Sequence, residues 1–181
     1  MGQIKKFINE KMLIGVLASD TAYLKPLEER LLREFGRIDY RSGILNFDFT
    51  DYYRREMGPE LKRIFFGFAK LIDPSLLSEI KIKTNEIENS FLNDGKRCLN
   101  LDPGLLSLNK FILATTKDNG HRIPLKDGIY GELSLCFINK GFRPLEWTYP
   151  DYKSGEYINI LEEIRSIYKK NLKQERGEGR R

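Results

Sequence analysis

The stretch Met12-Leu-Ile-Gly-Val-Leu-Ala18 is a short, continuous apolar run. Such a run is typical of a central strand that is covered on both faces of its sheet. Pro26 suits the first turn of a helix, where its missing N–H has no cost. Leu27, Leu31 and Phe35 follow at helical spacing, so we expect a helix directly after this strand.

More strands and a second helix are expected up to residue 102. Ile38 to Phe49 is rich in β-forming residues, and Ile64 to Ile72 is a second apolar run. Asp73-Pro74 is a strong helix start, and we expect that helix to run to about Phe91. Arg97 to Asp102 returns as a strand. The order β-α-β-β-α-β is the split pattern of a ferredoxin-like sheet.

The second half of the chain is expected to add strands and one helix. Residues 107–116 suit either a short helix or a strand, and periodicity does not decide between them. Asp127-Gly128 supplies a tight turn between two strands, and a last helix is expected from about Ser154 to Leu172. The predicted fold class is therefore α+β, a ferredoxin-like βαββαβ half with an added β-hairpin or meander and a C-terminal helix.

Composition indicates a globular protein with a charged end. Hydrophobic residues make up 40% of the 181 residues and charged residues 31%. The net charge is +5, but six basic and two acidic residues lie between 169 and 181, so four of the five net charges are there. We expect residues 1–172 to form a single domain and 173–181 a charged, disordered tail. Nucleic acid is expected to contact only this basic tail.

The sequence lacks the patterns of membrane and secreted proteins and the motifs of several enzyme classes. No apolar run approaches the roughly 20 residues that cross a membrane, and the N-terminus lacks a signal-peptide pattern, so we expect a cytoplasmic protein without membrane contact. The chain has no GxxxxGK[ST] loop, no GxGxxG and no GxSxG. One histidine and two distant cysteines argue against a zinc site.

Two polar segments are the strongest candidates for chemistry. Asn100 and Asp102 share one face of a predicted strand, at its end before Pro-Gly. There they suit either a capped turn or a site that orients a ligand or binds a hard cation such as Mg²⁺. In the second segment, residues 114–128, Lys117 and Arg122 suit phosphate or carboxylate recognition.

His121 has the side chain that titrates near neutral pH, so it suits either acid–base catalysis or a structural hydrogen bond. We expect one cleft to hold both polar segments, because function often lies in loops after strand ends. The candidate catalytic residues are His121 and Asp102, and the candidate ligand-binding residues are Asn100, Lys117, Asp118 and Arg122.

A third polar segment has two interpretations. Asp48, Asp51, Tyr52 and Tyr53 suit one wall of a pocket, with the tyrosines stacking on a flat ligand. They suit equally a long connection whose aromatic side chains hold it on the sheet. The aromatic residues in Trp147 to Tyr152 are expected to anchor the last helix.

The chain resembles a bacterial family catalogued as a domain of unknown function. The resemblance covers Leu13 to about Leu172 and rests on motifs that occur in order: Phe35-Gly-x-Ile-Asp39, Phe47-Asp-Phe-Thr-Asp-Tyr-Tyr53, Glu56-Met-Gly58, Asn100-Leu-Asp-Pro-Gly104, Ala114-Thr-Thr-Lys-Asp118, His121-Arg122, Asp127-Gly-Ile-Tyr130 and Trp147-Thr-Tyr-Pro-Asp-Tyr152. Some members carry a GTP-binding label, although this chain has no phosphate loop. The resemblance therefore implies no particular reaction.

Two functional hypotheses follow from these residues. The first is a protein or enzyme that binds a small phosphorylated or nucleotide-like anion, with Mg²⁺ as the cofactor considered. The second is a non-enzymatic module that binds RNA or another protein. Strong salt dependence would distinguish a polyanion bound by the tail from a ligand in a small pocket.

Overall fold

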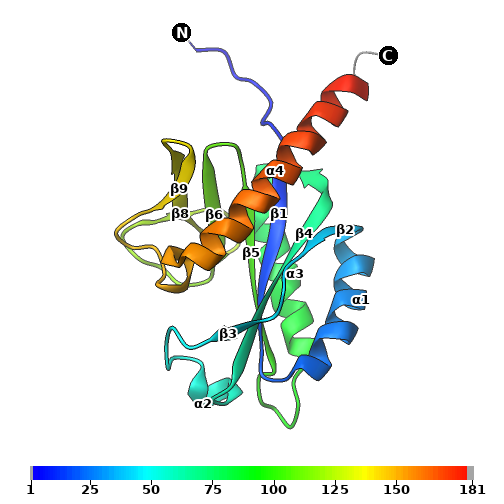
Figure 1. The fold of residues 1–181 in the computed structure, drawn as a ribbon, viewed down its shortest axis with the longest axis vertical. Coiled ribbons are helices and arrows are strands. Elements are labelled where there is room, and N and C mark those ends of the chain that lie inside the picture. Colours follow the sequence, from blue (N-terminus) through cyan, green and yellow to red (C-terminus); the bar gives the residue numbers. More distant parts are fainter. Residues whose placement is uncertain (1, 179–181) are drawn as a thin grey trace.

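The computed structural model of the protein describes residues 2–178 (Figure 1). Its elements are, in chain order, β1 (Glu10–Ala18), η1 (Thr21–Tyr23), α1 (Leu24–Phe35), β2 (Ile38–Arg41), β3 (Leu45–Phe47), α2 (Arg54–Met57), β4 (Leu61–Ile72), η2 (Pro74–Leu76), α3 (Leu77–Ser90), β5 (Leu99–Leu106), β6 (Lys110–Thr115), β7 (Arg122–Pro124), β8 (Tyr130–Ile138), β9 (Gly141–Pro144), η3 (Asp151–Lys153) and α4 (Gly155–Glu178).

The strands form one antiparallel sheet. Its main path runs β2-β4-β1-β5-β6-β8-β7, while β3 pairs with β4 and β9 with β8. Helices and an antiparallel sheet together confirm the α+β class. The ferredoxin-like description stays a prediction, since the sheet continues without a break from the first half of the chain into the second.

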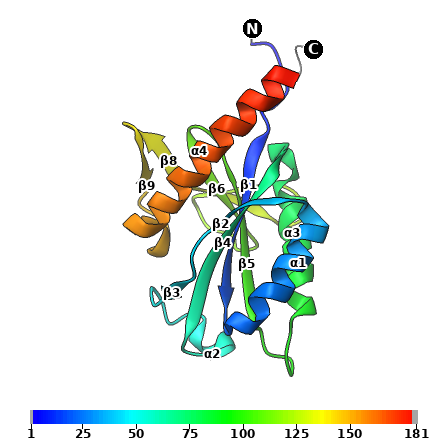
Figure 2. The same ribbon diagram turned by 45° about the vertical axis from the view of Figure 1, so that its right-hand side comes forward.

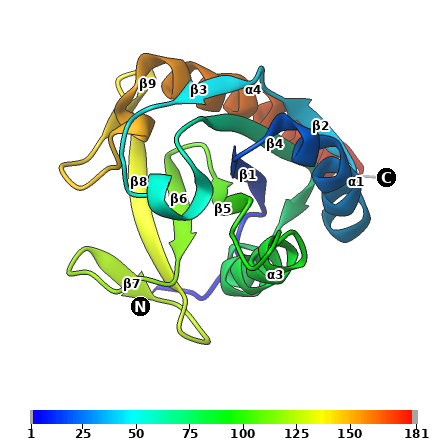
Figure 3. The same ribbon diagram turned by 90° about the horizontal axis from the view of Figure 1, so that it is seen from below.

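Helices cover the sheet on both faces. Figure 3 shows α3 and α4 on opposite sides of it, and α1 lies beside α3 in Figures 1 and 2. On β1, Ile14 and Val16 pack in the cluster that includes α1 and α3, whereas Leu13 packs in the cluster that includes α4. All nine residues of β1 are buried, as expected for a strand covered on both faces.

The structure shows that residues 107–116 contain a strand and not a helix, and it confirms the predicted hairpin. Residues 110–115 form a strand, β6, after a turn in which the Ser107 hydroxyl accepts a hydrogen bond from the Lys110 amide (3.1 Å). Asp127 (φ 55°) and Gly128 (φ 74°) both adopt the left-handed backbone conformation of a tight hairpin turn between β7 and β8.

One prediction about β5 was wrong. The strand does not end at Asp102 but continues through Pro103 and Gly104 to Leu106. Pro103 is tolerated because β5 pairs with β6 only from Gly104 onward. Pro103 has the orientation of Leu101, two residues earlier, so its missing N–H falls on the side where β5 has no neighbouring strand. Asp102 is therefore a residue within a strand and not a turn cap.

The last helix is longer than expected. It continues to Glu178, beyond the predicted end at Leu172, so part of the predicted tail is helical. Residues 179–181 lie outside the described residues. Within residues 2–178, no helix combines the length and the apolar character needed to span a membrane.

Candidate functional site

A cavity of about 460 Å³ lies where β5 and β6 separate. The ladder between these strands ends at the pair Gly104 and Leu113, which leaves one side of β5 without a strand from Leu99 to Pro103. The cavity occupies this gap. Its walls come from the β3–α2 connection, β4, α3, β5, the end of β6 and the segment before α4.

Side chains of α3 replace the missing strand along β5. The Leu101 amide donates to Glu88 Oε1 (2.7 Å), and Lys81 Nζ donates to the Leu101 carbonyl (2.8 Å). Arg97 then donates to Glu88 Oε2 (2.6 Å) and to Asn100 Oδ1 (2.5 Å). The two bonds to Leu101 satisfy backbone groups that a neighbouring strand would otherwise pair, which lowers the cost of the gap.

A group of polar residues that line the cavity and lie around one guanidinium, Arg63, Asp102, Asp151 and Tyr152, is here called the floor. Arg63 is 2% exposed and donates to Asp102 Oδ2 (3.1 Å) and to Asp151 Oδ2 (3.0 Å). Its Nε also donates to the Tyr157 hydroxyl (3.2 Å). One guanidinium thus joins two carboxylates that are far apart in the sequence.

Burial and charge set the protonation of the floor. Burial alone would raise the pKa of Asp102, but Arg63 and then Lys81 lower it below the usual value. Burial raises the pKa of Asp151, and Arg63 offsets only part of that rise. Burial also raises the pKa of Tyr152 well above its usual range, so its hydroxyl keeps its proton. The floor therefore contains a fixed cation, a stable carboxylate and a phenol that can donate.

Gly15 on β1 makes room for the floor. A Cβ atom at this position would lie 3.0 Å from both Arg63 Nη1 and the Tyr152 hydroxyl. Any larger residue would therefore push these two groups out of position.

Two buried polar atoms of the cavity wall lack hydrogen bonds. The Tyr152 hydroxyl has no partner, although the residue is only 2% exposed. Asn100 Nδ2 also makes none of acceptable geometry, yet the amide lies near enough to Asp102 to help lower the pKa of that carboxyl. Buried polar groups in folded proteins are nearly always paired, so the unpaired Tyr152 hydroxyl is an exception among the residues that line the cavity.

Three of the exposed residues that line the cavity, Tyr52, Thr116 and Lys117, are here called the rim. Lys117 Nζ donates to the Tyr52 hydroxyl (2.9 Å) and lies 4.2 Å from the centroid of that ring. Tyr53 and Tyr149 also line the cavity, and burial raises the pKa of both phenols. Tyr52 and Tyr53 therefore line the cavity, whereas Asp48 and Asp51 do not, and Tyr53 also packs against Phe47 as a connection held on the sheet would.

The structure brings some of the predicted site residues to the cavity and places others elsewhere. Asn100, Asp102 and Lys117 line it. His121 and Arg122 do not line the cavity, but both contact Glu132, which does. Asp118 is exposed and does not line the cavity.

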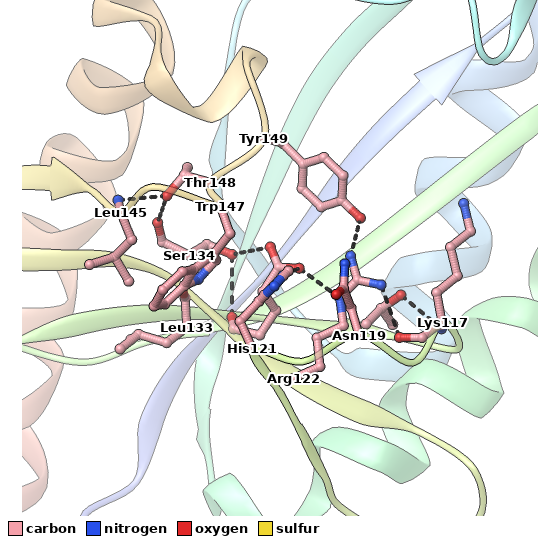
Figure 4. A network of polar contacts seen from close by, with 12 residues as sticks. Lys117, Asn119, His121, Arg122, Leu133, Ser134, Leu145, Trp147, Thr148 and Tyr149 are labelled. Atoms are coloured by element: carbon pink, nitrogen blue, oxygen red, sulfur yellow. Dashed lines mark hydrogen bonds and ion pairs between the residues drawn. The ribbon is translucent and has the colours of Figure 1, made fainter.

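His121 and Arg122 belong to a supporting network (Figure 4). His121 Nε2 lies 3.1 Å from Glu132 Oε2, and its ring stacks on Trp147 with 5.2 Å between centroids. Arg122 Nε donates to the same Glu132 oxygen (2.8 Å). Its other nitrogens donate to the Tyr149 hydroxyl (2.7 Å) and the Lys117 carbonyl (2.9 Å). Arg122 thus fixes two parts of the cavity wall.

The sequence reasoning missed Arg63 and Asp151, the centre of the floor. The predicted strand began at Ile64, which left Arg63 outside it. A signal was present, because Arg63 alternates in phase with Phe65, a residue of the covered face. Asp151 lies among aromatic residues that were interpreted only as anchors for the last helix.

The floor carboxylates have no arrangement typical of a metal centre. Within the described part of the chain, no group of three His, Cys, Asp or Glu residues could hold a metal ion. Asp102 and Asp151 are instead bonded to a cation of the protein.

The comparisons with known proteins identify a family. A family model described as "Domain of unknown function (DUF4416)" matches residues 8–168. The chain therefore belongs to this family, as its motifs predicted. No curated protein and no solved structure matches the chain.

Proposed function

We propose that this member of the family binds a small anionic molecule, of the phosphorylated or nucleotide-like kind, in the cavity between β5 and β6. One observation carries the proposal. Tyr152 lines a cavity of about 460 Å³, and its buried hydroxyl has no hydrogen-bond partner in the protein. Ligand sites commonly measure roughly 300–1,000 Å³ and combine apolar walls with a few polar groups.

The rim supports an anionic ligand. Lys117 Nζ has no carboxylate within 4.0 Å among the side chains that the structure describes. Thr115 and Thr116 line the cavity next to it and add hydroxyl groups. A lysine flanked by hydroxyls suits a phosphate, which accepts several hydrogen bonds and carries negative charge.

The proposed role of His121 is support for the wall. Its ring is held between Glu132 and Trp147, and it does not line the cavity. We therefore assign ligand contacts to Asn100, Asp102 and Lys117. Any Mg²⁺ would arrive with the phosphate oxygens of the ligand, since the protein offers no three-residue cluster among its described residues.

A thermal-shift screen tests the proposal. The panel holds nucleotides, sugar phosphates and carboxylates, each with and without Mg²⁺. A ligand at a hundred times its Kd stabilises the fold by about 2.7 kcal/mol, which raises the Tm by roughly 5–10 °C for a domain of this size. Lys117→Gln should reduce that shift. Lys25→Gln, an exposed lysine of α1 that does not line the cavity, should leave it unchanged.

Absence of a shift with every compound would refute the proposal. The RNA- or protein-binding module would then be the function to test. RNA bound through the basic residues of the C-terminal end should dissociate steeply with added salt. Binding within the cavity should change much less, because it neutralises few phosphates.

A further inference from the structure

The floor has an excess of negative charge. Arg63 is bonded to both Asp102 and Asp151, so these three groups together carry one net negative charge when ionised. In each carboxylate, Oδ2 accepts the bond from Arg63. A carboxylate has about four acceptor positions, so capacity for further donors remains. About 25% of the Asp102 side chain is exposed.

The cations near the floor are already neutralised. Lys81 lies 3.8 Å from Glu88, and Arg97 lies 2.6 Å from Glu88 and 3.6 Å from Glu56, so two carboxylates balance these two cations. An anion that reached the floor would meet carboxylates and would find no unpaired cation there. The negative group of a ligand is therefore favoured at the rim, where Lys117 is available.

The hydrogen-bonding groups of the floor indicate what the other end of the ligand presents. Asp102 and Asp151 accept hydrogen bonds, and the Tyr152 hydroxyl can both donate and accept. A hydroxyl group has the same dual capacity. Two neighbouring hydroxyls could therefore donate to the carboxylates while one of them accepts from Tyr152.

We infer that the ligand is a phosphate monoester with vicinal hydroxyls, bound with its phosphate at the rim and its hydroxyls on the floor. This inference rests on the proposed function and adds an orientation to it. A sugar phosphate and a nucleotide share this chemistry. The cavity, which is lined by Tyr52, Tyr53 and Tyr149, would in addition allow a nucleobase to stack near its mouth.

Isothermal titration with matched probes tests the inference. The affinities of ribose 5-phosphate and AMP for the protein are compared with those of ribose, adenosine and inorganic phosphate. At least one monoester should bind about tenfold more tightly than inorganic phosphate and than its own neutral parent. Stronger binding of AMP would identify a nucleotide, and stronger binding of ribose 5-phosphate a sugar phosphate.

Two variants separate the ends of the cavity. Lys117→Gln should weaken the monoester about tenfold and leave its neutral parent unaffected. Tyr152→Phe should weaken both, because it removes only a floor hydroxyl. This hydroxyl has no partner in the protein, so the variant should fold normally. Tyr40→Phe is the control, since its hydroxyl bonds Glu163 outside the cavity (2.7 Å).

The outcomes distinguish the inference from the function on which it rests. If inorganic phosphate binds as tightly as the monoesters, or if Tyr152→Phe leaves monoester affinity unchanged, the orientation is wrong although the cavity still binds anions. If none of the probes binds and the broader screen also fails, both the proposed function and the inference are refuted.

Discussion

Replacement of Arg63 by methionine should strongly destabilise the protein at neutral pH. The variant keeps much of the apolar volume but leaves Asp102 and Asp151 without their common cation. Removal of one partner from a buried ion pair typically costs about 3–5 kcal/mol. For a domain of this size, that cost corresponds to a fall in Tm of roughly 6–20 °C.

The cost should depend on pH in a defined direction. In the wild type, the pKa of Asp151 is raised by burial, so its contribution to stability improves as the pH falls through that raised pKa toward the usual value of an aspartate. The pKa of Asp102 is lowered, mainly by Arg63, so its contribution is lost only as the pH falls below about 4. Without Arg63 both carboxyls should have higher pKa values. They would then take up protons at a higher pH than in the wild type, which relieves the repulsion.

Urea unfolding of wild type and Arg63→Met at pH 7 and pH 5 measures this effect. The difference in unfolding free energy should shrink at pH 5. Arg41→Met is the control, because the Arg41 side chain is 45% exposed and pairs with Glu28 near the surface; it should cost less than about 1 kcal/mol. An equal cost of Arg63→Met at both pH values would refute the electrostatic reasoning, as would a cost below about 1 kcal/mol at pH 7.

Other substitutions test the backbone and the supporting network. Gly104→Ala should lower the unfolding free energy, measured with urea, by about 2 kcal/mol or more, because the new Cβ would lie 2.8 Å from the Ile112 carbonyl oxygen. The control is Pro103→Ala, on the side of β5 without a neighbouring strand, which should change the same free energy by less than about 1 kcal/mol. His121→Asn should cost about 1–3 kcal/mol by the same assay, since it disturbs the contacts with Glu132 and Trp147; a cost below about 0.5 kcal/mol would argue against a supporting role. Deletion of Gln174 to Arg181 should leave the Tm within about 5 °C by calorimetry, because the described side chains after Leu172 are exposed; a larger fall would show that this end docks on the fold.

Local signals in the sequence determined most of the elements. The apolar run from Met12 to Ala18 has few alternatives to a buried strand. Asp73 caps η2 through its side chain, which accepts from the Ser75 amide, and α3 follows directly. Asp127-Gly128 forms the predicted turn. These predictions succeeded because each depends on the backbone preferences of a few neighbouring residues.

Only part of the candidate site could be predicted from the sequence. Asn100, Asp102 and Lys117 were identified as polar residues near strand ends and do line the cavity. Arg63 was missed because the predicted strand began at Ile64, three residues after the observed start at Leu61, and its partner Asp151 lies 88 positions away. Pairing over such a separation leaves no periodic trace in a single sequence.

The tertiary structure alone decided where the cavity opens. The sequence specifies that β5 and β6 are strands, but their ladder stops at Gly104 because α3 supplies Lys81 and Glu88 to the backbone beyond it. Gly15 on the neighbouring strand leaves the space into which Arg63 and Tyr152 fit. A gap of this kind depends on how three separate elements meet. Strand propensity is a property of each segment, whereas the absence of a neighbour is a property of the assembled sheet.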